Sequence, residues 1–153
     1  MYELRKQVNI PAPVEEIFSF FSAVENLKLI MPPWLYFKIV TPFPIKMERN
    51  ALIDYSIKII GLRVAWRTEI TLWQPPDRFV DRQTKGPYRV WEHTHLFANH
   101  DGGTQMTDIV RYAVPGFVLS PFVQFLFVRP QLEKIFSFRE QRLLELFPSR
   151  ETG

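Results

Sequence analysis

The chain has 153 residues, of which 46% are hydrophobic and 15% aromatic, so its composition excludes intrinsic disorder and suits one domain. It contains no cysteine, which excludes thiol catalysis, thiolate metal sites and a disulfide scaffold. The formal net charge of +3 is mild, and the arginines of residues 58–89 alternate with Glu69, Asp77 and Asp81, as on a solvated sheet face. We therefore expect one domain over residues 1–153 and no nucleic-acid partner.

The first predicted element is a strand over residues 2–10, in which apolar and polar side chains mostly alternate. The charges at Glu3, Arg5 and Lys6 leave no apolar run, so this segment is not a secretory signal. We therefore expect a cytoplasmic protein.

Two short helices are predicted next. Pro13 suits the first turn of a helix, where a missing N–H costs nothing, and two glutamates follow it at the positive end. Ser22 and Glu25 have capping-box spacing, which predicts a second helix that ends before Pro32.

Residues 36–115 show a period of two almost throughout, interrupted by proline and glycine clusters. This pattern predicts a meander of about six further strands. In residues 53–59 and 64–70 the apolar side chains alternate with charged or hydroxyl-bearing ones. One face of the sheet should therefore be buried and the other solvated.

A long amphipathic helix is predicted near the C-terminus, beginning at the cap Ser120 and the first-turn Pro121. Pro130 lies inside this segment and removes the hydrogen bond to the carbonyl of Leu126, so we expect a kink or a separate short helix there. The residues with helical spacing are Leu132, Ile135, Phe136, Arg139, Leu143 and Phe147.

Seven short segments carry a resemblance to a known family: 32–34 (PPW), 52–55 (LIDY), 66–70 (WRTEI), 73–79 (WQPPDRF), 86–88 (GPY), 91–95 (WEHTH) and 102–104 (GGT). With the order of the elements, they resemble the START-like, birch-pollen-allergen-like (SRPBCC) superfamily, near its bacterial polyketide cyclase/dehydrase-like members. The resemblance implies an α+β helix-grip fold, in which a curved antiparallel sheet of about seven strands surrounds a long C-terminal helix, with two short helices after the first strand.

The same resemblance implies that a small hydrophobic or amphipathic molecule binds between the sheet and the C-terminal helix, where we expect a cavity of about 300–1,000 Å³. Transport of that molecule, including lipid transfer at a membrane surface, and cyclase or dehydratase-like catalysis are the alternatives. The family offers no fixed catalytic residue, so roles must come from this chain's own side chains.

The candidate catalytic residues are His93, His95 and Asp108. Alternation within residues 88–98 places both histidines on the bulky face of one strand, and Asp108 falls on the apolar side of the next. They are interpreted as an acid–base pair, as hydrogen-bonding partners of a ligand, or as hydrogen-bonded core residues. Because no further ligand is evident, we expect neither a metal nor another cofactor.

The expected ligand-binding residues are aromatic or polar side chains on the predicted inner face, although such stripes are also typical of a filled core. They are Tyr55, Trp66, Gln83, Trp91, His93, His95, Phe122 and Phe125.

The uncharged residues 117–122 are rich in large apolar side chains and are predicted to contact a membrane transiently as a lid, with buried packing or a dimer contact as the alternative. Pro115, Gly116 and Pro121 interrupt the surrounding uncharged stretch 112–128, so a transmembrane helix is not expected. The sequence leaves the oligomeric state open.

Overall fold

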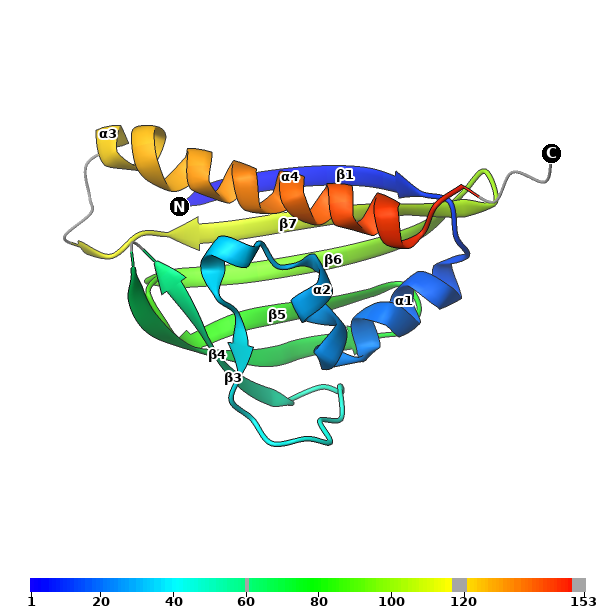
Figure 1. Ribbon diagram of the computed structural model, residues 1–153, viewed down its shortest axis with the longest axis horizontal. Coiled ribbons are helices and arrows are strands. Elements are labelled where there is room, and N and C mark those ends of the chain that lie inside the picture. Colours follow the sequence, from blue (N-terminus) through cyan, green and yellow to red (C-terminus); the bar gives the residue numbers. More distant parts are fainter. Residues whose placement is uncertain (60, 117–120, 150–153) are drawn as a thin grey trace.

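The computed structural model describes residues 1–59, 61–116 and 121–149 (Figure 1). The elements, in chain order, are β1 (Tyr2–Ile10), α1 (Val14–Ser22), η1 (Val24–Asn26), α2 (Leu27–Ile30), η2 (Pro33–Leu35), β2 (Lys38–Ile39), β3 (Leu52–Ile59), β4 (Leu62–Gln74), β5 (Arg78–Lys85), β6 (Val90–His100), β7 (Gly103–Ala113), α3 (Pro121–Val123), the π-helical turn η4 (Gln124–Val128) and α4 (Arg129–Leu146).

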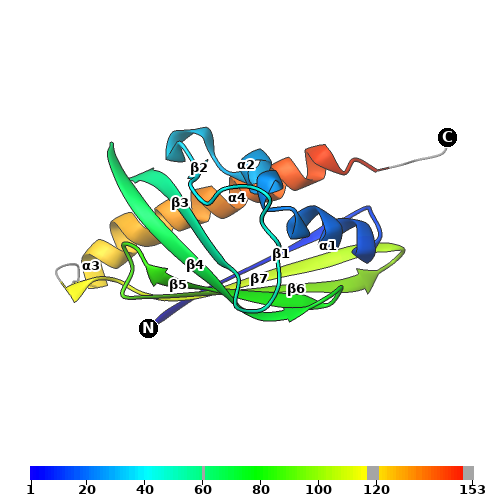
Figure 2. The same ribbon diagram turned by 90° about the horizontal axis from the view of Figure 1, so that it is seen from below.

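The strands form one antiparallel sheet of 7 strands in the order β1-β7-β6-β5-β4-β3-β2. Each neighbouring pair from β3 to β7 is consecutive in the chain, as expected for a meander, and β1 joins the sheet beside β7. The helices cover one face of this sheet, with α4 running along it above β1 and β7 (Figures 1 and 2). The predicted α+β helix-grip architecture is confirmed.

The two short helices lie where they were predicted, but the predicted cap of the second helix is wrong. Pro13 is the N-terminal cap of α1, as its fixed backbone angle favours. Ser22 ends α1 instead of beginning the next helix, because its hydroxyl donates a 2.9 Å hydrogen bond back to the carbonyl of Phe18. The chain then continues through η1 into α2.

In place of the expected kink or separate short helix at Pro130, a π-helical turn continues without a break from α3 into α4. The backbone N–H of Arg129 bonds to the carbonyl of Gln124, five residues earlier, which is the spacing of a π-helical turn. Pro130 then falls in the first turn of α4, where a missing N–H leaves no helical bond unmade. Among the described residues, no helix is both long and apolar enough to cross a membrane.

Two groups of buried side chains lie between the sheet and the helices. The first group, which we call the α1 core, surrounds α1 and consists of Val8, Ile10, Ala12, Val14, Ile17, Phe18, Phe21, Ile30, Ile70, Phe79, Phe97, Met106 and Leu143. The second, which we call the aromatic core, lies beneath the first turns of α4 and consists of Leu4, Leu35, Ile57, Trp66, Trp91, Val110, Tyr112, Val114, Leu132 and Phe136.

Candidate functional site

A pocket of about 160 Å³ lies between the sheet and α4, next to the aromatic core. Its walls come from α2, the inner faces of β3 to β6 and the buried stripe of α4. The volume is smaller than the sequence led us to expect, because large aromatic side chains enter the space from the sheet. They include Tyr55, Trp66 and Trp91 of the strands, and Tyr88 of the turn between β5 and β6 adds a fourth ring.

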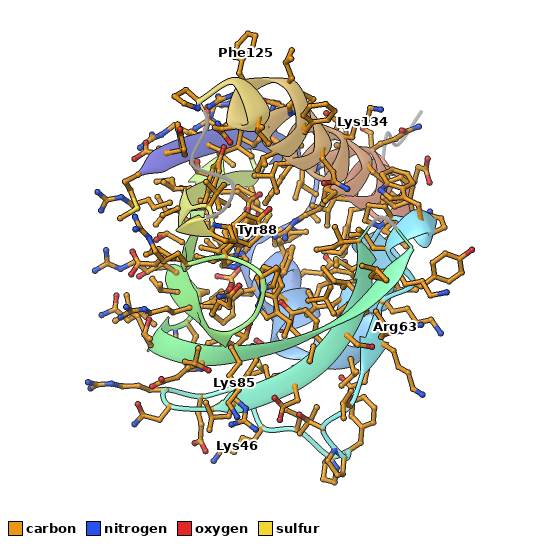
Figure 3. The ribbon with its side chains drawn as sticks, turned by 90° about the vertical axis from the view of Figure 1, so that its left-hand side faces the viewer. Lys46, Arg63, Lys85, Tyr88, Phe125 and Lys134 are labelled. Carbon is orange, nitrogen blue, oxygen red and sulfur yellow. The ribbon has the colours of Figure 1, made fainter. Side chains whose placement is uncertain are left out.

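The aromatic wall is fixed by ring contacts and one buried hydrogen bond. Trp66 stacks on Tyr55, with ring centroids 5.8 Å apart, and meets Trp91 edge-on at 5.3 Å. The indole N–H of Trp66 donates to the hydroxyl of Thr68 at 3.1 Å, which satisfies the polar atom of this buried side chain. Tyr88 lies near the centre of the molecule when it is viewed from the α3 end (Figure 3).

Five polar side chains meet at the inner end of the pocket, and we call them the polar cluster: Asp81, His93, His95, Asp108 and Arg139. The strand register brings four of them together, because His93 lies opposite Asp81 of β5 and His95 lies opposite Asp108 of β7. Arg139 reaches the same place from the buried stripe of α4.

Asp108 and His93 form the most buried hydrogen bond of this cluster. His93 Nε2 lies 2.7 Å from Asp108 Oδ1, and Arg139 Nη2 donates to the same oxygen at 3.2 Å. Burial alone would raise the pKa of Asp108, but the charge of Arg139 and the hydrogen bond from His93 outweigh it and hold that pKa well below the usual range. Asp108 is therefore an ionised acceptor, and His93 donates from Nε2.

The tautomer of His95 follows from its contact with Arg139. Arg139 Nη2 lies 3.3 Å from His95 Nδ1, and since a guanidinium only donates, Nδ1 accepts. The hydrogen of the neutral ring is then on Nε2, which donates to Asp81 Oδ2 at 2.6 Å. Burial, together with the charge of Arg139, lowers the pKa of His95 well below its ordinary value, which agrees with a neutral ring.

The side of the cluster that lines the pocket has both donors and acceptors to offer. His93 Nδ1, the ring nitrogen that does not bond to Asp108, lies 3.8 Å from Asp81 Oδ2. Burial raises the pKa of Asp81, although His93 and Arg139 oppose that shift. The arrangement can accept a proton, return it, or hydrogen-bond a polar ligand atom.

Asp81, His93 and His95 could also hold a metal ion, because their ligand atoms lie within 4.8 Å of one another. The direct hydrogen bond between His95 and Asp81 occupies two of those atoms. The guanidinium of Arg139, in contact with the same imidazole, adds a positive charge that disfavours a dication.

The structure places most of the sequence-predicted site residues in one region. Tyr55, Trp66, Trp91, His93 and His95 line the pocket. Asp108 is buried behind His93 and contacts the pocket residues through its hydrogen bonds.

Gln83 and Phe125 lie away from the pocket wall, contrary to the sequence-based expectation. Gln83 instead bonds the backbone of Tyr88, with its Nε2 donating to the carbonyl oxygen at 2.6 Å. Phe125 is 71% exposed and projects outward at the top of Figure 3. The π-helical turn explains the exposure of Phe125, because one extra residue per turn moves Gln124 into the buried stripe in its place.

The side chain of Phe122 lies outside the described residues, as do positions 117–120 of the predicted membrane-contacting lid.

Sequence reasoning gave Arg139 no functional role. The sequence nevertheless indicates that Arg139 is special. It is the single arginine in the apolar stripe of the helix, between Phe136 and Leu143, and a buried arginine needs a partner for its charge. Asp81, one of the acidic residues that alternate with arginines in the sequence, lies opposite His93 in the structure and lines the pocket.

Sequence and structure comparisons indicate what the chain is similar to. The model of the family described as "Polyketide cyclase / dehydrase and lipid transport" matches residues 10–134. No curated protein sequence matches the chain at a significant level.

Among solved structures, protein CV1439 from Chromobacterium violaceum has a TM-score of 0.75 at 12% identity, covering 99% of this chain and 100% of that one. Protein Ms6760 from Mycobacterium smegmatis has a TM-score of 0.71 at 20% identity, covering 97% and 92%. Major latex-like protein 151 from Panax ginseng has a TM-score of 0.70 at 10% identity, covering 96% and 97%. At these identities the likeness shows a shared fold.

Proposed function

We propose, from the premise that this chain belongs to the polyketide cyclase/dehydrase and lipid transport family of the SRPBCC superfamily, that it binds a small amphipathic molecule in the pocket beneath α4. One observation carries the proposal. Aromatic and aliphatic side chains form most of the pocket lining, and Asp81, His93, His95 and Arg139 of the polar cluster form a polar part of it. This distribution suits a ligand with an apolar body and a polar group at one end.

The size of the pocket restricts the body of this ligand. Its volume is about 160 Å³, and an engineered apolar cavity of about 150 Å³ in another protein binds benzene. A body of about one ring therefore fits the pocket as it stands. A longer molecule would extend through the mouth or displace wall side chains.

Binding is tested first by native mass spectrometry of the purified protein, with extraction and identification of any bound small molecule. A direct test is titration with propylbenzene, followed by calorimetry and tryptophan fluorescence, since Trp66 and Trp91 line the pocket. We expect Trp91→Ala to weaken this binding about fivefold, through lost apolar contact. Trp73→Ala is the matched control, because Trp73 packs on Phe18 and does not line the pocket. Equal affinity in both folded variants, or no binding to the wild type, would contradict the proposal.

Acid–base catalysis is the second candidate function, and the contact between His93 and Asp108 favours it. His93 is oriented by an ionised carboxylate and lines the pocket, so its free Nδ1 is positioned to take a proton from a bound molecule. His93→Gln distinguishes the two functions. A binding protein should keep its affinity within about tenfold, whereas an enzyme should lose turnover of an identified substrate by about a hundredfold. Unchanged turnover in this variant would reject catalysis by His93.

Transfer at a membrane surface rests on a separate observation. Phe125, Leu126 and Phe127 are consecutive and exposed, at 71%, 44% and 65%. Exposed apolar residues at a helix start are typical of interfacial contacts, and the nearby Arg129 favours anionic headgroups. Sedimentation with phosphatidylglycerol vesicles tests this contact. Phe127→Ser should reduce the bound fraction, and Leu62→Ser, at an equally exposed position on β4, is the control.

A further inference from the structure

Arg139 carries an unmet hydrogen-bond donor in the interior of the protein. The side chain is 9% exposed, and its Nη2 donates to Asp108 and to His95. Its Nε, in contrast, is the one buried side-chain nitrogen or oxygen without a partner among the residues that the structure describes. A buried N–H without an acceptor costs folding free energy. We therefore expect a group from outside the chain, such as a water molecule or a ligand atom, to accept a hydrogen bond from this guanidinium.

Two acceptors accompany this donor on the pocket wall. Asp81 lines the pocket, and its Oδ2 accepts from His95. His93 offers the lone pair of Nδ1, since its Nε2–H is committed to Asp108. Arg139 lines the pocket with both of them. A ligand group that both accepts and donates hydrogen bonds can therefore pair with the Arg139 donor and with one of the two acceptors.

The charges around the wall favour an uncharged group. Asp108 balances Arg139, and His95 is neutral, so the remaining titratable groups of the cluster are Asp81 and His93. A ligand carboxylate would meet the carboxyl group of Asp81, and a ligand ammonium would meet the guanidinium of Arg139. A hydroxyl group avoids both conflicts.

We propose that Asp81, His93 and Arg139 form a subsite for the uncharged hydroxyl group of a ligand whose apolar body is about one ring in size. The hydroxyl oxygen accepts from the guanidinium of Arg139, and its hydrogen is donated to Asp81 or to His93 Nδ1. This inference rests on the proposed binding function and specifies the chemical class of the ligand as a neutral phenol or alcohol.

Three matched probes test the subsite by calorimetry at pH 7.5: 4-propylphenol, propylbenzene and 4-propylbenzoate. They share one apolar body and differ in the polar group. We expect the phenol to bind at least tenfold more tightly than either of the others, as hydrogen bonds to charged partners allow. Equal affinity for phenol and hydrocarbon, within twofold, would overturn the subsite and leave the proposed function intact. Failure of all three to bind would overturn both.

Variants then identify the residues responsible. Arg139→Lys keeps the positive charge beside Asp108 but lacks the other N–H groups of the guanidinium, which would donate to the ligand hydroxyl. The preference for 4-propylphenol over propylbenzene should therefore fall to less than threefold. Arg142→Lys is the control, since Arg142 lies on the same helix and bonds Leu29 and Glu145 instead of pocket residues. A preference retained in Arg139→Lys would overturn the assignment.

If Arg139→Lys does not fold, Asp81→Asn provides an independent test of the same subsite. Removing the carboxyl group should raise the affinity for 4-propylbenzoate, relative to the phenol, at least tenfold. An unchanged ratio would show that Asp81 does not face the ligand.

Discussion

The α1 core and the aromatic core lie on the same face of one sheet, yet only the first is filled. In the α1 core a helix inserts Phe18 against Phe79 and Phe97, with ring centroids 5.9 and 5.3 Å apart. Next to the aromatic core, rings as large as those of Trp66 and Trp91 leave a pocket of about 160 Å³. A helix covers the sheet in both regions, since α4 lies over the aromatic core, so the difference is that α1 packs its rings directly against those of the sheet, whereas a pocket remains beneath α4.

The polar cluster lies at the boundary between these regions. The ring of His95 stacks on Phe79 of the α1 core at 4.0 Å, and His93 meets Phe136 of the aromatic core at 5.5 Å. The polar cluster therefore contacts both cores, and Phe21, Ile70 and Phe79 of the α1 core line the pocket beside it. Four predictions test this contrast, starting with the largest expected effect.

Phe18→Ala should produce the largest loss of stability, about 3–5 kcal/mol, because it opens a void in the filled region. Phe18 is 4% exposed and contacts three other rings. Urea denaturation measures the effect, and Phe125→Ala, at an exposed position, should change the unfolding free energy by less than about 0.5 kcal/mol. A loss below about 1 kcal/mol for Phe18→Ala would show that the α1 core is loosely packed.

The second prediction concerns pH and tests the boundary. Burial lowers the pKa of His95 well below its ordinary value of 6.5, so the folded state keeps this ring neutral while the unfolded chain protonates it. The contribution of His95 to the unfolding free energy is then fully present above pH 6.5 and is lost progressively as the pH falls below that value. From pH 7.5 to 5.5 this single proton should cost about 1.4 kcal/mol.

His95→Gln should flatten that slope, and His100→Gln should not, because His100 is largely exposed. The raised pKa of Asp81 acts in the opposite direction, since its protonation at lower pH favours the folded state. Slopes of unfolding free energy against pH are therefore compared between the two variants. Identical slopes would mean that His95 is not kept neutral in the fold.

Filling the hollow region is the third test. Ile135 lines the pocket from α4, and Ile135→Trp should occupy part of the space that a ligand needs. Propylbenzene affinity should fall at least tenfold, while the unfolding free energy changes by less than about 1.5 kcal/mol. Leu144→Trp, on the exposed side of the same helix, should leave affinity unchanged. Undiminished binding in Ile135→Trp would place the ligand elsewhere.

The fold was predictable because its signals are local or periodic. The alternation in β6 and β7 correctly placed His93, His95 and Asp108 on one buried face. Burial of one sheet face determines which side chains point inward, and a meander leaves few alternatives for strand order.

The rest of the site depends on distances that a sequence does not contain. Arg139 joins the polar cluster because α4 brings its side chain to His95 of β6 and Asp108 of β7. Phe125 faces outward because a single π-helical turn shifts the helical phase by one residue. The volume of the pocket depends on how far aromatic rings enter it, and composition fixes no such depth.

Gln83→Ala should have the smallest effect, and it tests whether a residue beside the pocket lining contributes to ligand binding. Gln83 holds the turn between β5 and β6 through two bonds to the backbone of Tyr88, at 2.6 and 3.1 Å. Gly86 allows this approach, since a Cβ there would lie 2.5 Å from the Gln83 amide oxygen. Losing both bonds at a half-buried site should cost about 1 kcal/mol. Phenol affinity should change less than threefold, because Tyr88, and not Gln83, lines the pocket. A loss of affinity above tenfold with little loss of stability would show instead that Gln83 contacts the ligand directly.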